Sequence, residues 1–198
     1  MELVMIRHGL PERILGAEGP ADPGLRSEGR SQAERLATHL SAEHIDAIYS
    51  SPLRRALQTA ELAARQLGLS VQVIDDLAEV DRYSSSYIPM EELRRDPDLW
   101  TVLSASAGRD GGETREAFRK RVIAAIERII ETNPGRRVVV VSHGAVMNTY
   151  LGHILGIDRE LWFEPRYASI SRVLASRRGH RNVDSLNEIQ HLRPGALA

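Results

Sequence analysis

Short apolar runs alternate along the chain with segments of helical periodicity. Four runs have the length and composition of buried strands, and they cover residues 3–6, 45–49, 71–74 and 138–141. Helical spacing of apolar residues predicts helices over 27–40, from Ser51-Pro52 to Gly68, over 114–132 and over 145–155. Ser27 and Ser51 are the expected N-cap residues of the first two helices, because a serine hydroxyl can accept a hydrogen bond from a free helical N–H.

The other segments are less regular. Residues 9–25 are rich in glycine and proline and are expected to form a loop. Residues 75–112 contain three consecutive serines, two prolines and several glycines, with a helical piece expected around 90–103. Residues 168–175 and 183–189 are expected to be two strands of a hairpin that turns around Gly179.

Alternating strands and helices predict an α/β fold. We expect a three-layer α/β/α sandwich with a mainly parallel central sheet and an antiparallel edge hairpin. The 198 residues suit a single domain, 1–198, in which 75–112 form an irregular, lid-like insertion. Ligands of such sheets bind outside the carboxyl ends of the strands. The residues that follow the predicted strands are therefore the candidates for chemistry.

Composition narrows the possible functions. The net charge of −1 gives no general attraction to nucleic acid or to an acidic membrane, so neither is an expected partner. The absence of cysteine excludes disulfides, zinc–thiolate sites and a cysteine nucleophile. No apolar run approaches the ~18 residues of a membrane-spanning helix, and the N-terminus lacks the layout of a signal peptide. A cytoplasmic location is the expectation.

Four predicted strands deliver ionisable side chains to one edge of the sheet. The first strand ends in Arg-His-Gly and the valine strand in Ser-His-Gly, and the other two are followed by an arginine pair and by two carboxylates. A single histidine at a strand end is usually a surface residue, but the repeated His-Gly indicates a site. The candidate residues are Arg7, His8, Arg54, Arg55, Glu79, Asp81 and His143.

These residue types suit phosphate chemistry. Arginine donors match phosphate oxygens, and a helix N-terminus adds partial positive charge. A histidine between arginines stays neutral and nucleophilic, because nearby positive charge disfavours the imidazolium. It can take a phosphoryl group covalently while a carboxylic acid protonates the leaving oxygen. The arginines supply the charge that a metal would otherwise provide, and no Walker loop, HExxH or aspartate cluster is present, so no cofactor is expected.

Five motifs resemble, in order and spacing, the histidine phosphatase superfamily, which has the phosphoglycerate-mutase-like fold. They are IRHG, DPGLRSEGRSQA, YSSPLRRALQTAE, GGET and VVVSHGAVM, and the resemblance runs from Leu3 to about Leu155. It implies that His8 is the phosphorylated nucleophile, and that Arg7, Arg55 (rather than Arg54) and His143 bind the phosphate beside it. Glu79 matches the position of the proton donor, with Asp81 as the alternative.

The resemblance implies a metal-independent phosphatase that hydrolyses phosphate monoesters of a small metabolite through a phosphohistidine on His8. A phosphoglycerate-type phosphomutase with the same intermediate is the first alternative. It is less favoured, because residues 10–13 read LPER where those mutases carry Glu-Ser and Trp-Asn. A non-catalytic module that binds phosphorylated ligands or protein partners is the second alternative.

Two surface features can each be interpreted in two ways. The insertion carries Arg82, Arg94, Arg95 and Arg109, which either bind a second anionic group of the substrate or belong to a solvated lid. Leu161, Trp162 and Phe163 either form a homodimer interface or pack on the core as part of a helix–strand connection.

Overall fold

The computed structural model describes residues 1–96, 98 and 113–193. Its strands are β1 (Glu2–Arg7), β2 (Ala47–Ser50), β3 (Val71–Val73), β4 (Arg137–Ser142), β5 (Ile170–Ala175) and β6 (Arg181–Glu188). Its helices are α1 (Ser27–Leu40), α2 (Arg54–Leu67), α3 (Met90–Arg95), α5 (Arg115–Thr132) and α6 (Gly144–Leu155). Short 3₁₀ turns lie at η1 (Asp75–Leu77) and η2 (Gln190–Leu192).

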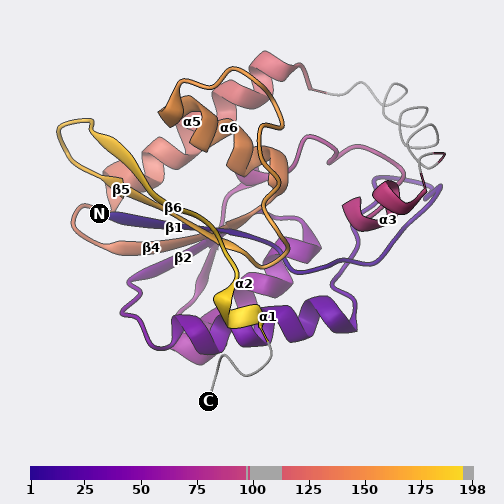
Figure 1. The fold of residues 1–198 in the computed structure, drawn as a ribbon, viewed down its shortest axis with the longest axis horizontal. Coiled ribbons are helices and arrows are strands. Elements are labelled where there is room, and N and C mark those ends of the chain that lie inside the picture. The colour runs from indigo at the N-terminus through magenta and orange to yellow at the C-terminus, as the bar shows by residue number, and fades with distance from the viewer. Residues whose placement is uncertain (97, 99–112, 194–198) are drawn as a thin grey trace.

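The strands form one sheet in the order β3-β2-β4-β1-β5-β6. The pairs β1–β4, β4–β2 and β2–β3 are parallel, whereas β5 runs antiparallel to both β1 and β6. Helices α5 and α6 cover one face of the sheet, and α1 and α2 cover the other (Figure 1). The predicted three-layer sandwich with an antiparallel edge hairpin is confirmed.

The two central strands are buried on both faces. On the face of α5 and α6, the core includes Leu3 and Met5 of β1 with Val138 and Val140 of β4. On the face of α1 and α2, it includes Val4, Ile6, Val139 and Val141. Successive side chains of a strand point to opposite faces, so a run of apolar residues is what a doubly covered strand needs. Burial of each such side chain contributes about 1.5–3 kcal/mol to the free energy of folding.

Helix starts differ from the sequence prediction at two places. Ser27 is the first residue of α1, and the N-cap position belongs to Arg26, which makes no side-chain cap bond. Helix α2 begins at Arg54, three residues after Ser51, and its N-cap is Leu53. The prediction of two serine caps is therefore wrong. Helix α3 covers only the first part of the helix expected at 90–103, and most of the rest of that prediction, residue 97 and residues 99–103, lies outside the described residues.

Gly9 follows the nucleophile candidate and lies against the first turn of α1. A Cβ at Gly9 would come within 2.5 Å of the carbonyl oxygen of Gly29, and one at Gly29 within 1.9 Å of the carbonyl oxygen of Leu10. Both distances are too short for a side chain, so two glycines facing each other allow α1 to approach the end of β1. The close contact that requires a glycine at position 9 is therefore with helix α1.

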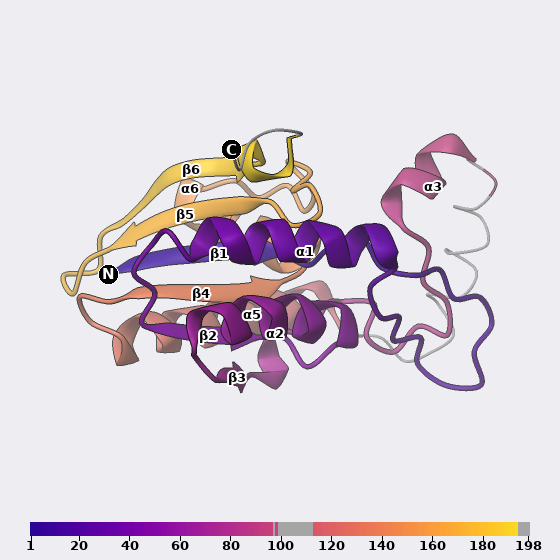
Figure 2. The same cartoon turned by 90° about the horizontal axis from the view of Figure 1, so that it is seen from below.

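The described start of the insertion, residues 75–96, and the loop that follows β1 lie together at one end of the sheet (Figure 2). Ile14 and Tyr87 form a β-bridge, and the N–H groups of Ala17 and Ala21 donate to the carbonyls of Ser85 and Ser84. These contacts join segments 14–21 and 84–87. None of the helices in the described part of the chain is long and apolar enough to cross a membrane.

The connection from α6 to β5 packs largely on the core. Trp162 and Phe163 are half-buried, and their N–H groups donate to Asn148 Oδ1 at 2.9 and 3.1 Å. Leu161 beside them is 54% exposed. Core packing therefore accounts for two of the three apolar residues in this connection, and a homodimer interface stays a prediction.

Candidate active site

The two histidines lie side by side because their strands are neighbours. Arg7 at the end of β1 is in register with Ser142 at the end of β4, and His8 and His143 follow them. The ring centroids of the two histidines are 5.1 Å apart, and both side chains are buried. Parallel pairing of β1 with β4 therefore assembles the pair from residues that are distant in the sequence.

A hydrogen bond to the next residue in the chain orients the imidazole of His8. Its Nδ1 lies 2.8 Å from the carbonyl oxygen of Gly9. A carbonyl only accepts, so Nδ1 carries the proton and Nε2 carries the lone pair. Nε2 is the nitrogen that can act as a nucleophile.

The ring of His143 has the opposite arrangement. Its Nε2 lies 2.7 Å from the hydroxyl oxygen of Ser51, and that oxygen accepts from the N–H of Leu53 at 3.3 Å. The Ser51 hydroxyl can donate its proton to His143 Nε2, and in that arrangement the ring proton of His143 lies on Nδ1. His143 Nδ1 is buried without a protein partner in the described part of the chain, and it can donate to an anion.

Arg7 and Arg55 are both buried, at 7% and 1% exposure, and both have spare donors. Arg7 Nη1 donates to the carbonyl of Pro165 at 2.6 Å, and Arg55 Nη2 donates to Asp81 Oδ1 at 3.1 Å. The Nε atoms of both arginines have no hydrogen-bond partner among the described residues. Buried guanidinium donors of this kind suit an anion. Arg54, in contrast, is exposed and bonds to Asp22.

Glu79 and Asp81 differ in their surroundings. The half-buried carboxyl of Glu79 accepts from the N–H of Ala145, in the first turn of α6, at 2.9 Å and from the N–H of Val80 at 2.9 Å. Asp81 forms an ion pair with Arg55. The carboxyl of Glu79 therefore lies close to His143, at the start of α6, while the charge of Asp81 is paired with that of Arg55.

Burial lowers the pKa values of the two histidines and raises the pKa of Glu79. Desolvation, followed by the charges of Arg55 and Arg7, lowers the pKa of His8 well below 6.5. Desolvation and Arg55 likewise lower the pKa of His143. Desolvation and the neighbouring Asp81 raise the pKa of Glu79, against the effect of its two N–H donors and of Arg55. The site can thus hold neutral imidazoles beside a protonated carboxyl group.

A family model described as the histidine phosphatase superfamily (branch 1) matches residues 3–189. The chain belongs to this superfamily. Phosphoserine phosphatase 1 of Hydrogenobacter thermophilus is 33% identical over 164 residues, which cover 80% of this chain and 78% of the relative. Phosphoglycerate mutase-like protein 4 of Arabidopsis thaliana is 35% identical over 161 residues, with 75% and 68% covered.

The solved structures similar to this histidine phosphatase include the phosphoserine phosphatase of Entamoeba histolytica in complex with 3-phosphoglyceric acid. The TM-score is 0.73 and the identity 29%, with 97% of this chain and 99% of that one covered. The family and its phosphatase relatives make the chain a phosphoric monoester hydrolase.

The structure adds three side chains to those found in the sequence of the histidine phosphatase. Ser51 contacts His143, and Tyr87 and Tyr167 lie under the guanidinium groups of Arg55 and Arg7. Ser51 directly follows β2, so the search at strand ends could have found it. Tyr167 precedes β5, which is antiparallel, so it reaches the same edge from the beginning of a strand.

Several charges of the insertion are already paired within the protein. Arg82 donates to both carboxylate oxygens of Asp75, and Arg94 forms an ion pair with Glu164. Arg109 lies outside the described residues. These pairs favour a structural role for Arg82 and Arg94 over binding of a second anionic group.

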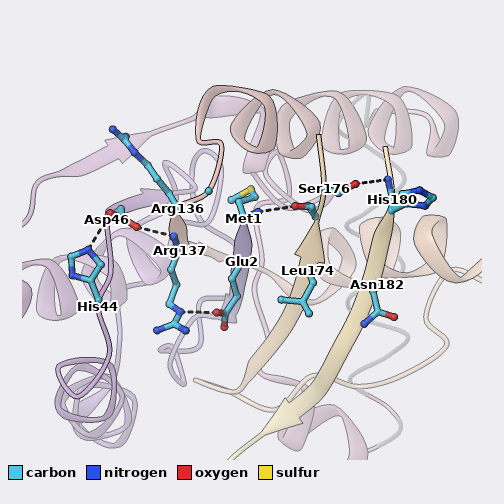
Figure 3. A pocket seen from close by; sticks show the side chains of 12 residues that line it. Met1, Glu2, His44, Asp46, Arg136, Arg137, Leu174, Ser176, His180 and Asn182 are labelled. Atoms are coloured by element: carbon cyan, nitrogen blue, oxygen red, sulfur yellow. Dashed lines mark hydrogen bonds and ion pairs between the residues drawn. The ribbon is translucent and has the colours of Figure 1, made fainter. Parts of the chain in front are cut away.

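One cavity of the histidine phosphatase, drawn in Figure 3, has neither of the two histidines in its lining. It measures about 710 Å³ and is formed at the N-terminal ends of β1 and β4. Charged groups that line it are paired with one another. The Arg137 side chain donates to the Glu2 carboxylate, and the Asp46 carboxylate accepts from the Arg137 backbone N–H and contacts the His44 ring. Among the residues that the structure describes, no three His, Asp or Glu side chains lie close enough together to hold a metal ion.

Proposed function

We propose that this histidine phosphatase hydrolyses phosphate monoesters of a small metabolite, without a metal, through a phosphohistidine on His8. The observation that carries the proposal is the set of unpartnered buried donors on Arg7, Arg55 and His143 around the lone-pair nitrogen of His8. A phosphoryl group offers three equatorial oxygens to such donors. The burial of the donors makes each one more effective than it would be in water.

In the first step, His8 Nε2 attacks phosphorus in line with the leaving oxygen. The N–P bond forms as the bond from phosphorus to the leaving oxygen breaks, and Glu79 gives its proton to that oxygen. Arg7, Arg55 and His143 donate to the equatorial oxygens. Each such donor is worth about 10²–10³ in rate by analogy with oxyanion donors.

In the second step, the Glu79 carboxylate takes a proton from water, and the oxygen of that water attacks the phosphorus of phospho-His8. The N–P bond breaks, inorganic phosphate leaves, and Glu79 is protonated again. A single carboxyl group thus acts as acid and then as base, which its raised pKa favours.

The first test is phosphate release from an aryl phosphate and from a panel of phosphorylated metabolites in the presence of EDTA. We expect turnover to be unaffected by EDTA, because the arginines supply the positive charge. The panel includes phosphoserine and 3-phosphoglycerate, named in relatives of this chain. Activity that EDTA abolishes contradicts the metal-independent mechanism. Movement of phosphate between positions of phosphoglycerate without release supports the mutase instead, and no reaction with any ester supports a binding module.

The pKa of His8 gives a prediction that needs no substrate. A lowered pKa means that the imidazole is neutral at pH 6.5, where an unperturbed histidine is half protonated. NMR titration of the ring protons, with the His8→Ala spectrum as assignment control, should show His8 in its neutral form at pH 6.5. Because folding disfavours its protonation, its contribution to stability is complete above pH 6.5 and is lost as the pH falls towards the lowered pKa. A midpoint at or above 6.5 contradicts this electrostatic account.

A further inference from the structure

The two phosphate-site arginines are held in the same way. The guanidinium carbon of Arg7 lies 3.8 Å from the centre of the Tyr167 ring, and that of Arg55 lies 4.5 Å from the centre of the Tyr87 ring. Each arginine also donates to one acceptor from the segment that carries its tyrosine: Arg7 to Pro165, and Arg55 to Asp81. A ring and an acceptor together therefore hold each guanidinium in place.

This arrangement leaves one buried donor, the Nε atom, of each arginine free among the described residues. One Nη of each arginine is used by its acceptor, and the guanidinium carbon of each lies over a tyrosine ring. The buried Nε of each remains without a protein partner in the described part of the chain. An anion can therefore be bound by donors whose directions are set before it arrives, which reduces the ordering that binding must otherwise bring about.

Tyr167 is itself held firmly. The next residue, Ala168, has φ of 55°, a conformation that a non-glycine residue adopts only when its surroundings impose it. The Ala168 N–H donates to the carbonyls of both Arg7 and His8. The Tyr167 hydroxyl accepts from the N–H of Met90 at 3.3 Å. The ring under Arg7 is thus tied to the end of β1 on one side and to α3 on the other.

Tyr87 is held by the loop that follows β1. Its N–H and its carbonyl form two hydrogen bonds with the backbone of Ile14, at 2.8 and 2.9 Å. Both tyrosine rings are nearly buried, at 9% for Tyr87 and 4% for Tyr167. A cation–π contact is stronger in such desolvated surroundings than at an exposed site.

We propose that Tyr87 and Tyr167 are positioning residues that orient the guanidinium groups of Arg55 and Arg7 for the phosphate. The inference rests on the proposed function, in which those arginines bind the transferring phosphoryl group. The tyrosines act through the arginines and are assigned no chemical step.

The test compares Tyr167→Leu and Tyr167→Phe by the inhibition constant of inorganic phosphate and by kcat and KM for an aryl phosphate. Leu removes the ring under Arg7, and we expect about tenfold weaker phosphate inhibition, equivalent to about 1.4 kcal/mol, with a fall in kcat/KM. Phe keeps the ring and should restore phosphate inhibition to nearly the wild-type value. Tyr87→Leu and Tyr87→Phe repeat the comparison at Arg55. If Tyr167→Leu does not fold, Tyr167→Met takes its place.

Tyr150→Phe is the matched control, because Tyr150 is a buried tyrosine whose hydroxyl donates to Glu127, in the α5–α6 layer. We expect this variant to keep the phosphate inhibition constant of the wild type, whatever its melting temperature. Leu variants with wild-type phosphate inhibition, or Phe variants as weak as Leu, overturn the positioning role. If His8→Ala keeps its activity, the proposed function fails instead, and that result is separate from the tyrosine comparison.

Discussion

Replacement of His8 by alanine should lower kcat/KM for every phosphate ester by at least about 10⁴-fold, because it removes the group to which phosphorus is transferred. The wild type, quenched in alkali after brief reaction with labelled substrate, should carry label on one histidine. That label should be stable to base and lost in acid, as a phosphoramidate is. His8→Ala should carry none.

His44→Ala is the control for this experiment. The side chain of His44 is 86% exposed and lies at the opposite edge of the sheet, where it contacts Asp46. This variant should keep wild-type activity and labelling. Should His8→Ala keep a tenth of the activity, or should the label lie on another residue, the phosphohistidine mechanism is wrong.

Replacement of Glu79 by glutamine should have the second largest effect, and its size should depend on the leaving group. Gln cannot protonate an alkoxide, so an alkyl phosphate such as phosphoserine should lose about 10²–10⁴ in kcat/KM. An aryl phosphate with a good leaving group needs little protonation and should lose much less in phosphoenzyme formation. A plot of log kcat/KM against leaving-group pKa should therefore be steeper for Glu79→Gln than for the wild type.

Asp81→Asn is the matched variant, because it makes the same isosteric change two residues away. It removes the acceptor that orients Arg55 and one cause of the raised pKa of Glu79, but it leaves the Glu79 carboxyl group in place. The leaving-group slope should therefore change less for Asp81→Asn than for Glu79→Gln. If the slope changes for Asp81→Asn and not for Glu79→Gln, Asp81 is the proton donor. Equal slopes in the wild type and both variants would exclude both carboxyl groups.

Much of the fold could be predicted because the two central strands are covered on both faces. The valines of β4 alternate between the α5–α6 core and the α1–α2 core, so no polar position interrupts the run. Helix starts were harder to predict. Ser27 and Ser51 have the right residue type for N-caps, but Ser51 is used by His143 instead, and a capping propensity contains no information about such a distant partner.

The site could be predicted where it follows parallel strands and not elsewhere. His8, His143 and Arg55 were found because parallel strands bring their carboxyl ends to one edge. Tyr167 and Pro165 reach Arg7 from the amino end of β5, and the rule for parallel strands does not cover that direction. The contact between Gly9 and Gly29 of α1 could not be predicted either, because the sequence does not show that these two residues meet.

The position of β1 in the sheet has a consequence for synthesis of the chain. Both neighbours of β1, the strands β4 and β5, lie beyond residue 136, so β1 leaves the ribosome long before either partner is synthesised. Until then an apolar strand with two open edges is exposed, which is a hazard for aggregation. A nascent chain that stops before β4 has Arg7 and His8 but no second histidine beside them. The nascent chain should therefore bind phosphate only late in translation. Phosphate binding by a nascent chain would then indicate that β1 and β4 have paired.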